Sequence, residues 1–140
     1  MRKILFRGKR EDTGEWAEGY LMQPNPAVCR VYEIGKCAIC YQYSFDAGLA
    51  ILPVIPETVG QYTGLTDKNR NKIFEGDICR NTRTGEVVSV AWHGTMAGFV
   101  WSKREENSHL FDFGELFRAH DKYEVIGNIH DNPELLEGNV

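Results

Sequence analysis

The sequence predicts a mainly β protein of the β-rich α+β class, with two β-rich subdomains about a glycine-rich connector. Two observations support this class. Apolar residues alternate with a period of two rather than 3.6, and turn-forming residues interrupt the apolar segments at short intervals. The chain has 140 residues, 42% hydrophobic and 26% charged, a composition typical of soluble globular proteins. We expect an N-terminal subdomain at 1–55, the connector at 56–77 and a C-terminal subdomain at 78–140, packed as one compact unit.

The N-terminal subdomain is expected to consist of antiparallel strands. The expected strands comprise residues 2–7, 15–22, 28–34, 37–45 and 49–55. The first two flank the polar turn 11–14 and therefore predict a hairpin. In the last strand Pro53 lacks an N–H donor, which favours an edge strand or a crossover.

The connector is expected to be mainly turns, because glycines recur among Thr, Asp and Asn. Its polar loop 68–72 contains Asn69 and Asn71, either of which can adopt the left-handed conformation at little cost. Beyond it, residues 77–80, 86–92 and 97–103 predict three successive strands, and this spacing suggests a small SH3-like curled sheet or barrel.

One or two short helices are expected in the C-terminal subdomain. Asp112 and Glu115 have the spacing of a capping box ahead of an apolar face. After a last strand at 123–129, Asn132-Pro133-Glu134 combines an N-cap residue, a first-position proline and a first-turn acid. These features predict a single terminal helical turn.

The formal net charge of −4 is unevenly distributed along the chain. Five basic residues, Arg2, Lys3, Arg7, Lys9 and Arg10, fall within ten positions that hold no acid. We expect them on a strand with a solvated edge, where charge discourages edge-to-edge pairing; the alternative is a phosphate-attracting cluster. The apolar stretches are too short for a signal peptide or a membrane helix. A cytoplasmic location without membrane contact is therefore expected.

The four cysteines are Cys29, Cys37, Cys40 and Cys79. In a reducing compartment a disulfide framework is not expected. Cys37 and Cys40 have the two-residue gap of a zinc site, but the other two cysteines are single. Free cysteine is among the most buried residue types, so core packing is favoured over zinc, and no cofactor is expected.

Several longer motifs resemble one family. The motifs span Ile4–Gly8, Gly14–Trp16, Gly19–Leu21, Pro56–Asn69, Ile73–Ile78 and Tyr123–Leu136. In this order they resemble the YopX family of phage and prophage proteins. The resemblance implies a phage or prophage origin and a β-rich fold. It implies no established activity, so it supplies no catalytic residues.

Within these motifs, aromatic and aliphatic residues are expected to fill the core, and polar residues are the functional candidates. The expected core residues are Trp16, Tyr20, Phe74 and Ile126. The binding candidates are Arg7, Gln61, Tyr62, Asp67 and Lys68. The candidates for metal or acid–base chemistry are Glu75, Asp77 and His130. For these three, hydrogen bonds within turns are favoured over catalysis.

Two classes of function follow from these residues. The favoured one is a module that binds a phage or host protein, or a second copy of the chain, with Tyr62, Trp92 and Trp101 expected as exposed aromatics. Nucleic acid is a less favoured partner, because a chain of charge −4 repels phosphate unless its basic N-terminal segment forms a separate patch. The alternative class is a small metal-dependent hydrolase or nuclease.

Overall fold

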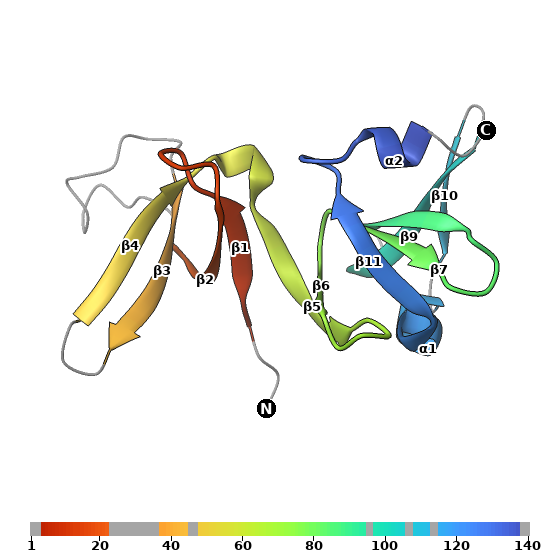
Figure 1. The fold of residues 1–140 in the computed structure, drawn as a ribbon, viewed down its shortest axis with the longest axis horizontal. Helices are drawn as coiled ribbons and strands as arrows, with labels where there is room; N and C mark the ends of the chain where they lie inside the picture. Colours follow the sequence, from red (N-terminus) through yellow and green to blue (C-terminus); the bar gives the residue numbers. More distant parts are fainter. Residues whose placement is uncertain are drawn as a thin grey trace. The chain divides into compact units, whose positions relative to one another are not determined.

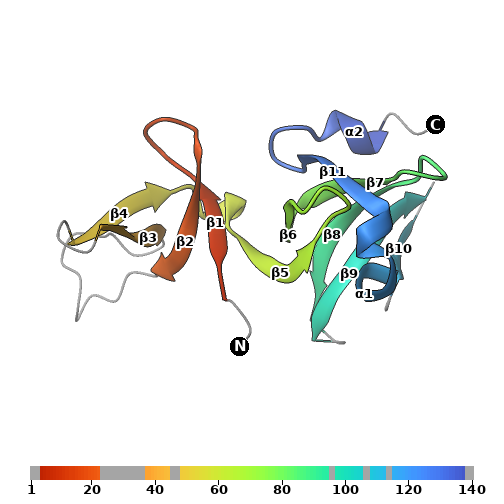
Figure 2. The same cartoon turned by 60° about the horizontal axis from the view of Figure 1, so that its bottom comes forward.

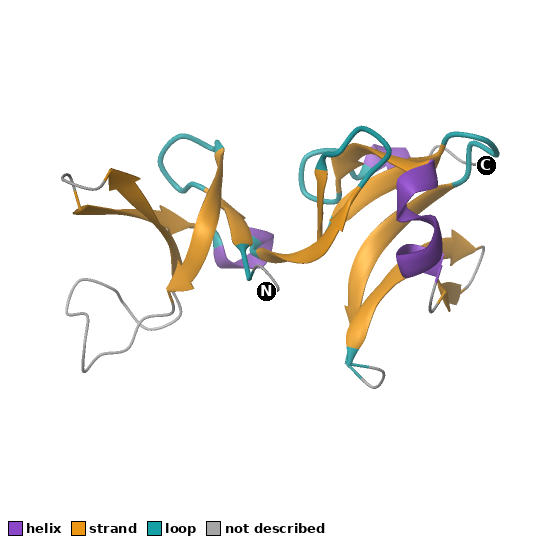
Figure 3. Cartoon of the chain, turned by 90° about the horizontal axis from the view of Figure 1, so that it is seen from below, coloured by secondary structure: helices purple, strands orange, loops and turns teal. Residues whose placement is uncertain are grey.

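The computed structural model describes residues 4–22, 37–44, 48–94, 97–105, 108–112 and 115–137. The chain divides into two compact units, Met1–Gln61 and Tyr62–Val140. Antiparallel strands dominate both units, and the helical segments are short (Figure 1, Figure 3). The mainly β class is therefore confirmed. The expected strand 28–34 lies outside the described residues.

The first unit is an antiparallel sheet. It contains β1 (Phe6–Lys9), β2 (Trp16–Met22), β3 (Cys37–Ser44) and β4 (Gly48–Val54), in the order β4-β3-β2-β1. The hairpin expected about the polar turn 11–14 is confirmed, with Phe6 opposite Gly19 and Lys9 opposite Trp16. Strand β4 ends this order, as Pro53 predicted. The helical turn η1 (Pro56–Thr58) follows it.

Strand β1 is not an edge strand, so the role expected for the charges of Arg7, Lys9 and Arg10 is wrong, while Arg2 and Lys3 lie outside the described residues. It pairs with β2 on one side and with the first residues of β5 (Gly60–Thr66) on the other, where Arg7 is opposite Gly60. The Arg7 guanidinium carbon lies 4.8 Å from the centroid of the Trp16 ring, a cation–π contact. Both Arg10 hydrogen bonds to Asp12 lie in the adjoining turn. These arginines therefore bind within the sheet and its turn.

The described core of the first unit is small. Ala17 and Val54 are buried, and four partly buried residues pack around them: Phe6, Leu21, Leu52 and Val59. Glycine at position 8 permits this packing, because a Cβ there would lie 2.8 Å from the Val54 Cγ2. Tyr20, which we expected in the core, is 66% exposed, since its side chain points to the solvated face of β2.

The second unit contains a five-stranded antiparallel sheet. Its strands are β7 (Asp77–Asn81), β8 (Val87–His93), β9 (Gly98–Glu105), β10 (Ser108–Asp112) and β11 (Tyr123–Asn128), in the order β10-β9-β8-β7-β11 (Figure 2). The three successive strands expected from 77 to 103 are confirmed, and each pairs with the next. A bulge interrupts the β7–β11 register between Val125 and Gly127.

The expected connector 56–77 forms more strand than its turn-rich composition suggests. It holds η1, β5 and β6 (Lys72–Phe74), and the boundary between the units falls inside β5, after Gln61. Within the second unit, β5 pairs with β6 through Tyr62 opposite Phe74. Glycine allows the irregular pairing that follows, because Gly64 has a φ of +87°.

The second unit has a continuous hydrophobic core. Its buried members are Ile73, Cys79, Val88, Val90, Phe99, Trp101, Leu116, Ala119 and Tyr123, with Leu65 and Val125 packed against them. The Trp101 and Tyr123 rings are in contact, tilted by 34° with centroids 4.7 Å apart. Trp101 is 1% exposed, so the expectation of an exposed aromatic there is wrong: on β9 it faces the core opposite Val90.

Short helical segments flank this sheet. Helix α1 (Glu115–Ala119) packs against β9 and buries Leu116, while η2 (His120–Lys122) leads into β11. The expected terminal turn is present as α2 (Glu134–Glu137). The Asn132 side-chain oxygen, expected to cap that helix, instead accepts the Asn128 N–H at 3.3 Å. Among the residues that the structure describes, no helix is long and apolar enough to cross a membrane.

Candidate functional site

The turn Glu75-Gly76-Asp77 joins β6 to β7 in the second unit. Asp77 is 1% exposed, and its Oδ2 accepts the Phe74 N–H at 2.7 Å. Gly76 has a φ of +91°, which favours glycine, and its N–H donates to the Val90 carbonyl. The Gly76 carbonyl in turn accepts the Ile129 N–H at 2.9 Å. The Asp77 carboxylate therefore holds together a turn that is hydrogen-bonded to two further segments.

His130 lies in a second turn, which Asn128 organises. The Asn128 Oδ1 accepts the N–H groups of His130 at 3.0 Å and Asp131 at 2.9 Å, and its Nδ2 donates to the Asp131 Oδ2. The His130 Nε2 lies 3.8 Å from where a Cβ on Gly76 would stand. The structure thus brings His130 beside the turn 75–77. The hydrogen bonds found there fix backbone, as turn residues commonly do.

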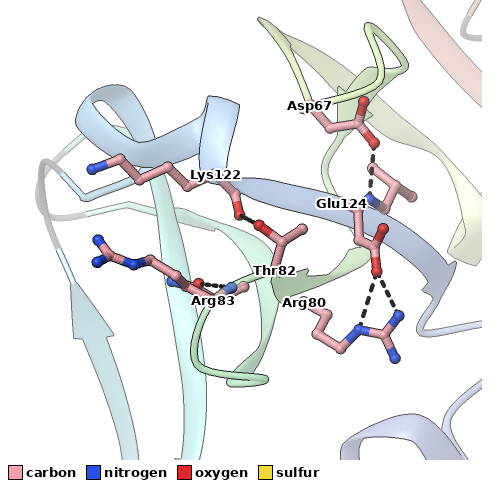
Figure 4. A network of polar contacts seen from close by, with 8 residues as sticks. Asp67, Arg80, Thr82, Arg83, Lys122 and Glu124 are labelled. Carbon is pink, nitrogen blue, oxygen red and sulfur yellow. Dashed lines mark hydrogen bonds and ion pairs between the residues drawn. The ribbon is translucent and has the colours of Figure 1, made fainter.

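Asp67 organises the loop between β5 and β6. Its Oδ1 accepts the N–H groups of Asn69 and Asn71, both at 2.8 Å, and its Oδ2 accepts the Val125 N–H at 2.9 Å (Figure 4). Burial of this carboxyl raises its pKa, but the backbone N–H donors outweigh burial and hold the pKa below its usual value. The ionised carboxylate is thus the form that the fold stabilises.

Arg70, at the tip of the same loop, has a φ of +64°. The expectation that Asn69 or Asn71 takes the left-handed conformation is therefore wrong. The reason lies in Asp67, because its Oδ1 binds the N–H groups of both asparagines and so fixes the backbone on either side of Arg70. Together with Lys68, whose N–H donates to the Tyr123 carbonyl at 2.9 Å, Asp67 covers the outer edge of β11.

A second loop, 81–85, reaches the start of the same strand. The Asn81 Oδ1 accepts the N–H groups of Arg83 at 2.9 Å and Thr84 at 3.2 Å. Both the N–H and the hydroxyl of Thr82 donate to the Lys122 carbonyl at 3.1 Å (Figure 4). Two loops from different parts of the sequence therefore meet at Lys122 and the residue after it.

One ion pair links β7 and β11 beside these loops. The guanidinium of Arg80 binds the Glu124 Oε1 through its Nε at 3.1 Å and through an Nη (Figure 4). The two residues are direct cross-strand partners in the register. Glu124 is thus neutralised, whereas the side chains of Arg83 and Lys122 are exposed. Sequence reasoning did not single out Arg83 or Lys122, because only strand pairing brings them together.

The remaining binding candidates fall in different units. Arg7 and Gln61 belong to the first unit, and Tyr62 and Lys68 to the second. Tyr62 is half-buried, with its ring 5.6 Å from that of Phe74. A shallow hollow of about 340 Å³ on the first unit contains none of the binding candidates. It is lined by Arg10, Glu15, Trp16, Ala17, Glu18 and Leu52.

The cysteines are also divided between the units. Cys79 is buried in the core of the second unit, as core packing predicts. Cys37 and Cys40 lie on β3 in the first unit, and Cys29 lies outside the described residues. Among the side chains that the structure describes, no group of three or more His, Cys, Asp or Glu could hold a metal ion.

Among the residues of the second unit whose burial the structure describes, Trp92 is the large exposed aromatic side chain. It is 50% exposed near the end of β8, and it continues the face that buries Val88 and Val90. The ring of Phe99, its cross-strand partner, packs edge-on against it with centroids 5.1 Å apart. A tryptophan that packs against a buried ring on one side and is exposed to solvent on the other is a common contact residue at protein interfaces.

Comparisons with known proteins identify relatives but no activity. The sequence model of one family, described as YopX protein, matches residues 5–137. No curated protein matches the sequence. Among solved structures, the protein EF1440 from Enterococcus faecalis is similar, with a TM-score of 0.54 and 24% identity over 97% of this chain and 99% of that one. This likeness shows a shared fold.

Proposed function

The chain belongs to the YopX family, and from this premise we propose that it works by binding a protein partner rather than by catalysis. Trp92 is the observation that carries the proposal. Half of its surface is exposed, and its position is fixed by the edge-on contact with Phe99. A rigid aromatic anchor loses little conformational entropy when a partner covers it.

The hydrogen bonds of the catalytic candidates support binding over catalysis. Asp77 is buried and accepts a backbone N–H, and the turn of His130 is fixed by Asn128. A general base must reach a proton on a substrate, which a buried carboxylate directed at its own backbone does not do. The hydrolase or nuclease alternative predicts that the protein degrades DNA or RNA in the presence of Mg²⁺. We expect intact probes.

The origin implied by the family suggests where to look for the partner. We propose a phage or host protein in the cytoplasm of a bacterial cell, or a second copy of the chain. Affinity capture from a prophage-carrying host tests this proposal, with each captured protein then purified and titrated against the chain. The Trp92→Ala variant should lose at least about tenfold in affinity, the scale of an interface hot spot.

A matched control distinguishes a specific contribution of Trp92 from nonspecific hydrophobic binding by any exposed aromatic ring. Tyr20 in the first unit is 66% exposed, so Tyr20→Ala removes an exposed ring of similar size from another place. It should leave the affinity unchanged. Equal loss in both variants, or retention of affinity in Trp92→Ala, would refute the proposed site. Sedimentation of the wild type and Trp92→Ala alone tests self-association, which the substitution should abolish if the partner is a second copy.

A further inference from the structure

Positive charge is concentrated on one part of the second unit. Segments 66–72, 80–86 and 118–124 carry seven Lys and Arg against four Asp and Glu. The rest of Tyr62–Val140 carries two basic and nine acidic residues. Because the three segments are separated in the sequence, this distribution is not visible as a charge run. The fold creates it, since the hydrogen bonds of Lys68 and Thr82 bring all three segments to the start of β11.

Four exposed cations define what we call the basic loop surface: Lys68, Arg70, Arg83 and Lys122. None of the four forms an ion pair with a residue that the structure describes. Two nearby acids are already neutralised or buried. Glu124 binds Arg80, and Asp67 accepts backbone N–H groups. Asp121 is exposed in η2 and subtracts one charge.

The backbone beneath these cations is fixed before any ligand binds. Asp67 holds the backbone of the loop that bears Lys68 and Arg70, and Asn81 holds that of the loop that bears Arg83. An exposed loop whose backbone is not held by such hydrogen bonds loses conformational entropy when it binds a ligand, and this loss lowers the affinity. Fixed loops avoid that loss.

We propose that the basic loop surface binds the phosphate backbone of a nucleic-acid duplex without reading its sequence. Arg and Lys, assisted by Asn, Thr and backbone N–H groups, make most phosphate contacts in protein–DNA complexes. The exposed side chains of Asn69 and Thr84 supply such groups here. This site differs from the N-terminal basic segment, where Arg7 lies on Trp16 and Arg10 binds Asp12.

The composition of the surface argues against other anionic partners. The large exposed hydrophobic residues described are Ile4, Tyr20, Ile55, Trp92 and Ile129, and none lies on the three segments. A protein interface usually needs a buried aromatic or aliphatic anchor, and a membrane-surface site needs apolar residues to insert. Single-stranded nucleic acid is usually held by aromatic stacking. A duplex backbone requires only charge and hydrogen-bond donors.

The test is fluorescence anisotropy of the full chain with a labelled duplex of arbitrary sequence, as DNA and as RNA, over a range of salt concentrations. Wild type should bind at low salt, and its affinity should fall steeply as salt rises. The variant Lys68→Gln, Arg70→Gln, Arg83→Gln, Lys122→Gln should lose at least about tenfold in affinity. Its log–log salt slope should fall by about 3 to 4, because each phosphate contact contributes about 0.9.

A charge-matched control removes four positive charges from outside the three segments: Arg2→Gln, Lys3→Gln, Lys103→Gln and Arg104→Gln. It should keep most of the affinity and the salt slope. The paired variants Lys68→Gln, Arg70→Gln and Arg83→Gln, Lys122→Gln should each lose about half of the slope change. They guard against a folding defect in the fourfold variant, as does an unchanged melting temperature.

Three outcomes would overturn the proposal. They are failure of wild type to bind either duplex at low salt, equal loss in the fourfold variant and its control, and full competition by polyglutamate or by anionic lipid vesicles at equal charge. The proposal is independent of the protein-binding site. Trp92→Ala should bind the duplex as wild type does, and the fourfold variant should retain any protein partner.

Discussion

The two units are both antiparallel sheets, yet the described residues of each are stabilised differently. In the second unit, nine buried residues form one core that includes Trp101, Tyr123 and Leu116 from three different elements. In the described part of the first unit, Ala17 and Val54 are the buried residues of the core. There the backbone of β1 approaches Val54 directly at Gly8. As far as the described residues show, stability should therefore depend on side-chain packing in the second unit and on close backbone approach in the first.

The largest expected effect comes from the core of the second unit. Leu116→Ala removes a fully buried side chain from α1 and should destabilise that unit by about 2–5 kcal/mol. Val54→Ala in the first unit removes less apolar volume and should cost roughly 1.5 kcal/mol. Peptide-resolved hydrogen exchange distinguishes them. Leu116→Ala should raise exchange within 62–140 and Val54→Ala within 1–61. If either variant raised exchange equally in both ranges, the two units would not be separately stabilised.

A comparably large effect is expected at Asp67, which fixes backbone rather than filling volume. Asp67→Ala leaves the N–H groups of Asn69, Asn71 and Val125 without their acceptor and should destabilise the second unit by about 3 kcal/mol. Asp67→Asn keeps one carbonyl oxygen, so it should lose about half as much. Denaturant unfolding followed by fluorescence measures both. Equal stability of Asp67→Ala and wild type would contradict the role of this carboxylate.

Close approach of the backbone can be tested in the first unit by Gly8→Ala. The new Cβ would lie 2.8 Å from the Val54 Cγ2, so the strand or the side chain must shift, at about 1–3 kcal/mol. The double variant Gly8→Ala, Val54→Ala makes room for the methyl group and should recover part of this loss. A double-mutant cycle quantifies the recovery. Strict additivity of the two substitutions would show that the contact does not limit stability.

The sequence predicted much of the fold but little of what surrounds the candidate site. Period-two alternation and the turn residues between segments identified the first hairpin and the strands β7 to β9. The alternation corresponds to burial in β8, where buried Val88 and Val90 alternate with less buried residues. It misplaced Tyr20 and Trp101, because alternation alone does not say which face of a strand meets the core. It also missed the convergence of Arg83 and Lys122 with Lys68, since that depends on long-range pairing and on hydrogen bonds to consecutive carbonyls.

Acid should weaken the second unit through Asp67. Its pKa is lower in the folded state than in the unfolded chain, so the unfolded state binds more protons as the pH falls. The stabilisation is fully present above the unfolded-state pKa and is lost as the pH falls through the folded-state value. The difference in unfolding free energy between wild type and Asp67→Asn should therefore shrink with acidification. A difference that is constant or grows between pH 6 and pH 2 would contradict the depressed pKa.

The smallest expected effect concerns the cross-strand ion pair of the second unit. The side chains of Arg80 and Glu124 are 49% and 27% exposed, so water screens the attraction between their charges. Each side chain also loses conformational entropy when it is held in the geometry of the ion pair. Glu124→Gln should lower stability by about 0.2–1 kcal/mol, and the loss should shrink as salt rises. The substitution also removes the acid that neutralises Arg80, so duplex binding by the basic loop surface should strengthen rather than weaken. A large, salt-independent loss of stability would mean that this pair, and not the core, holds β11 to β7.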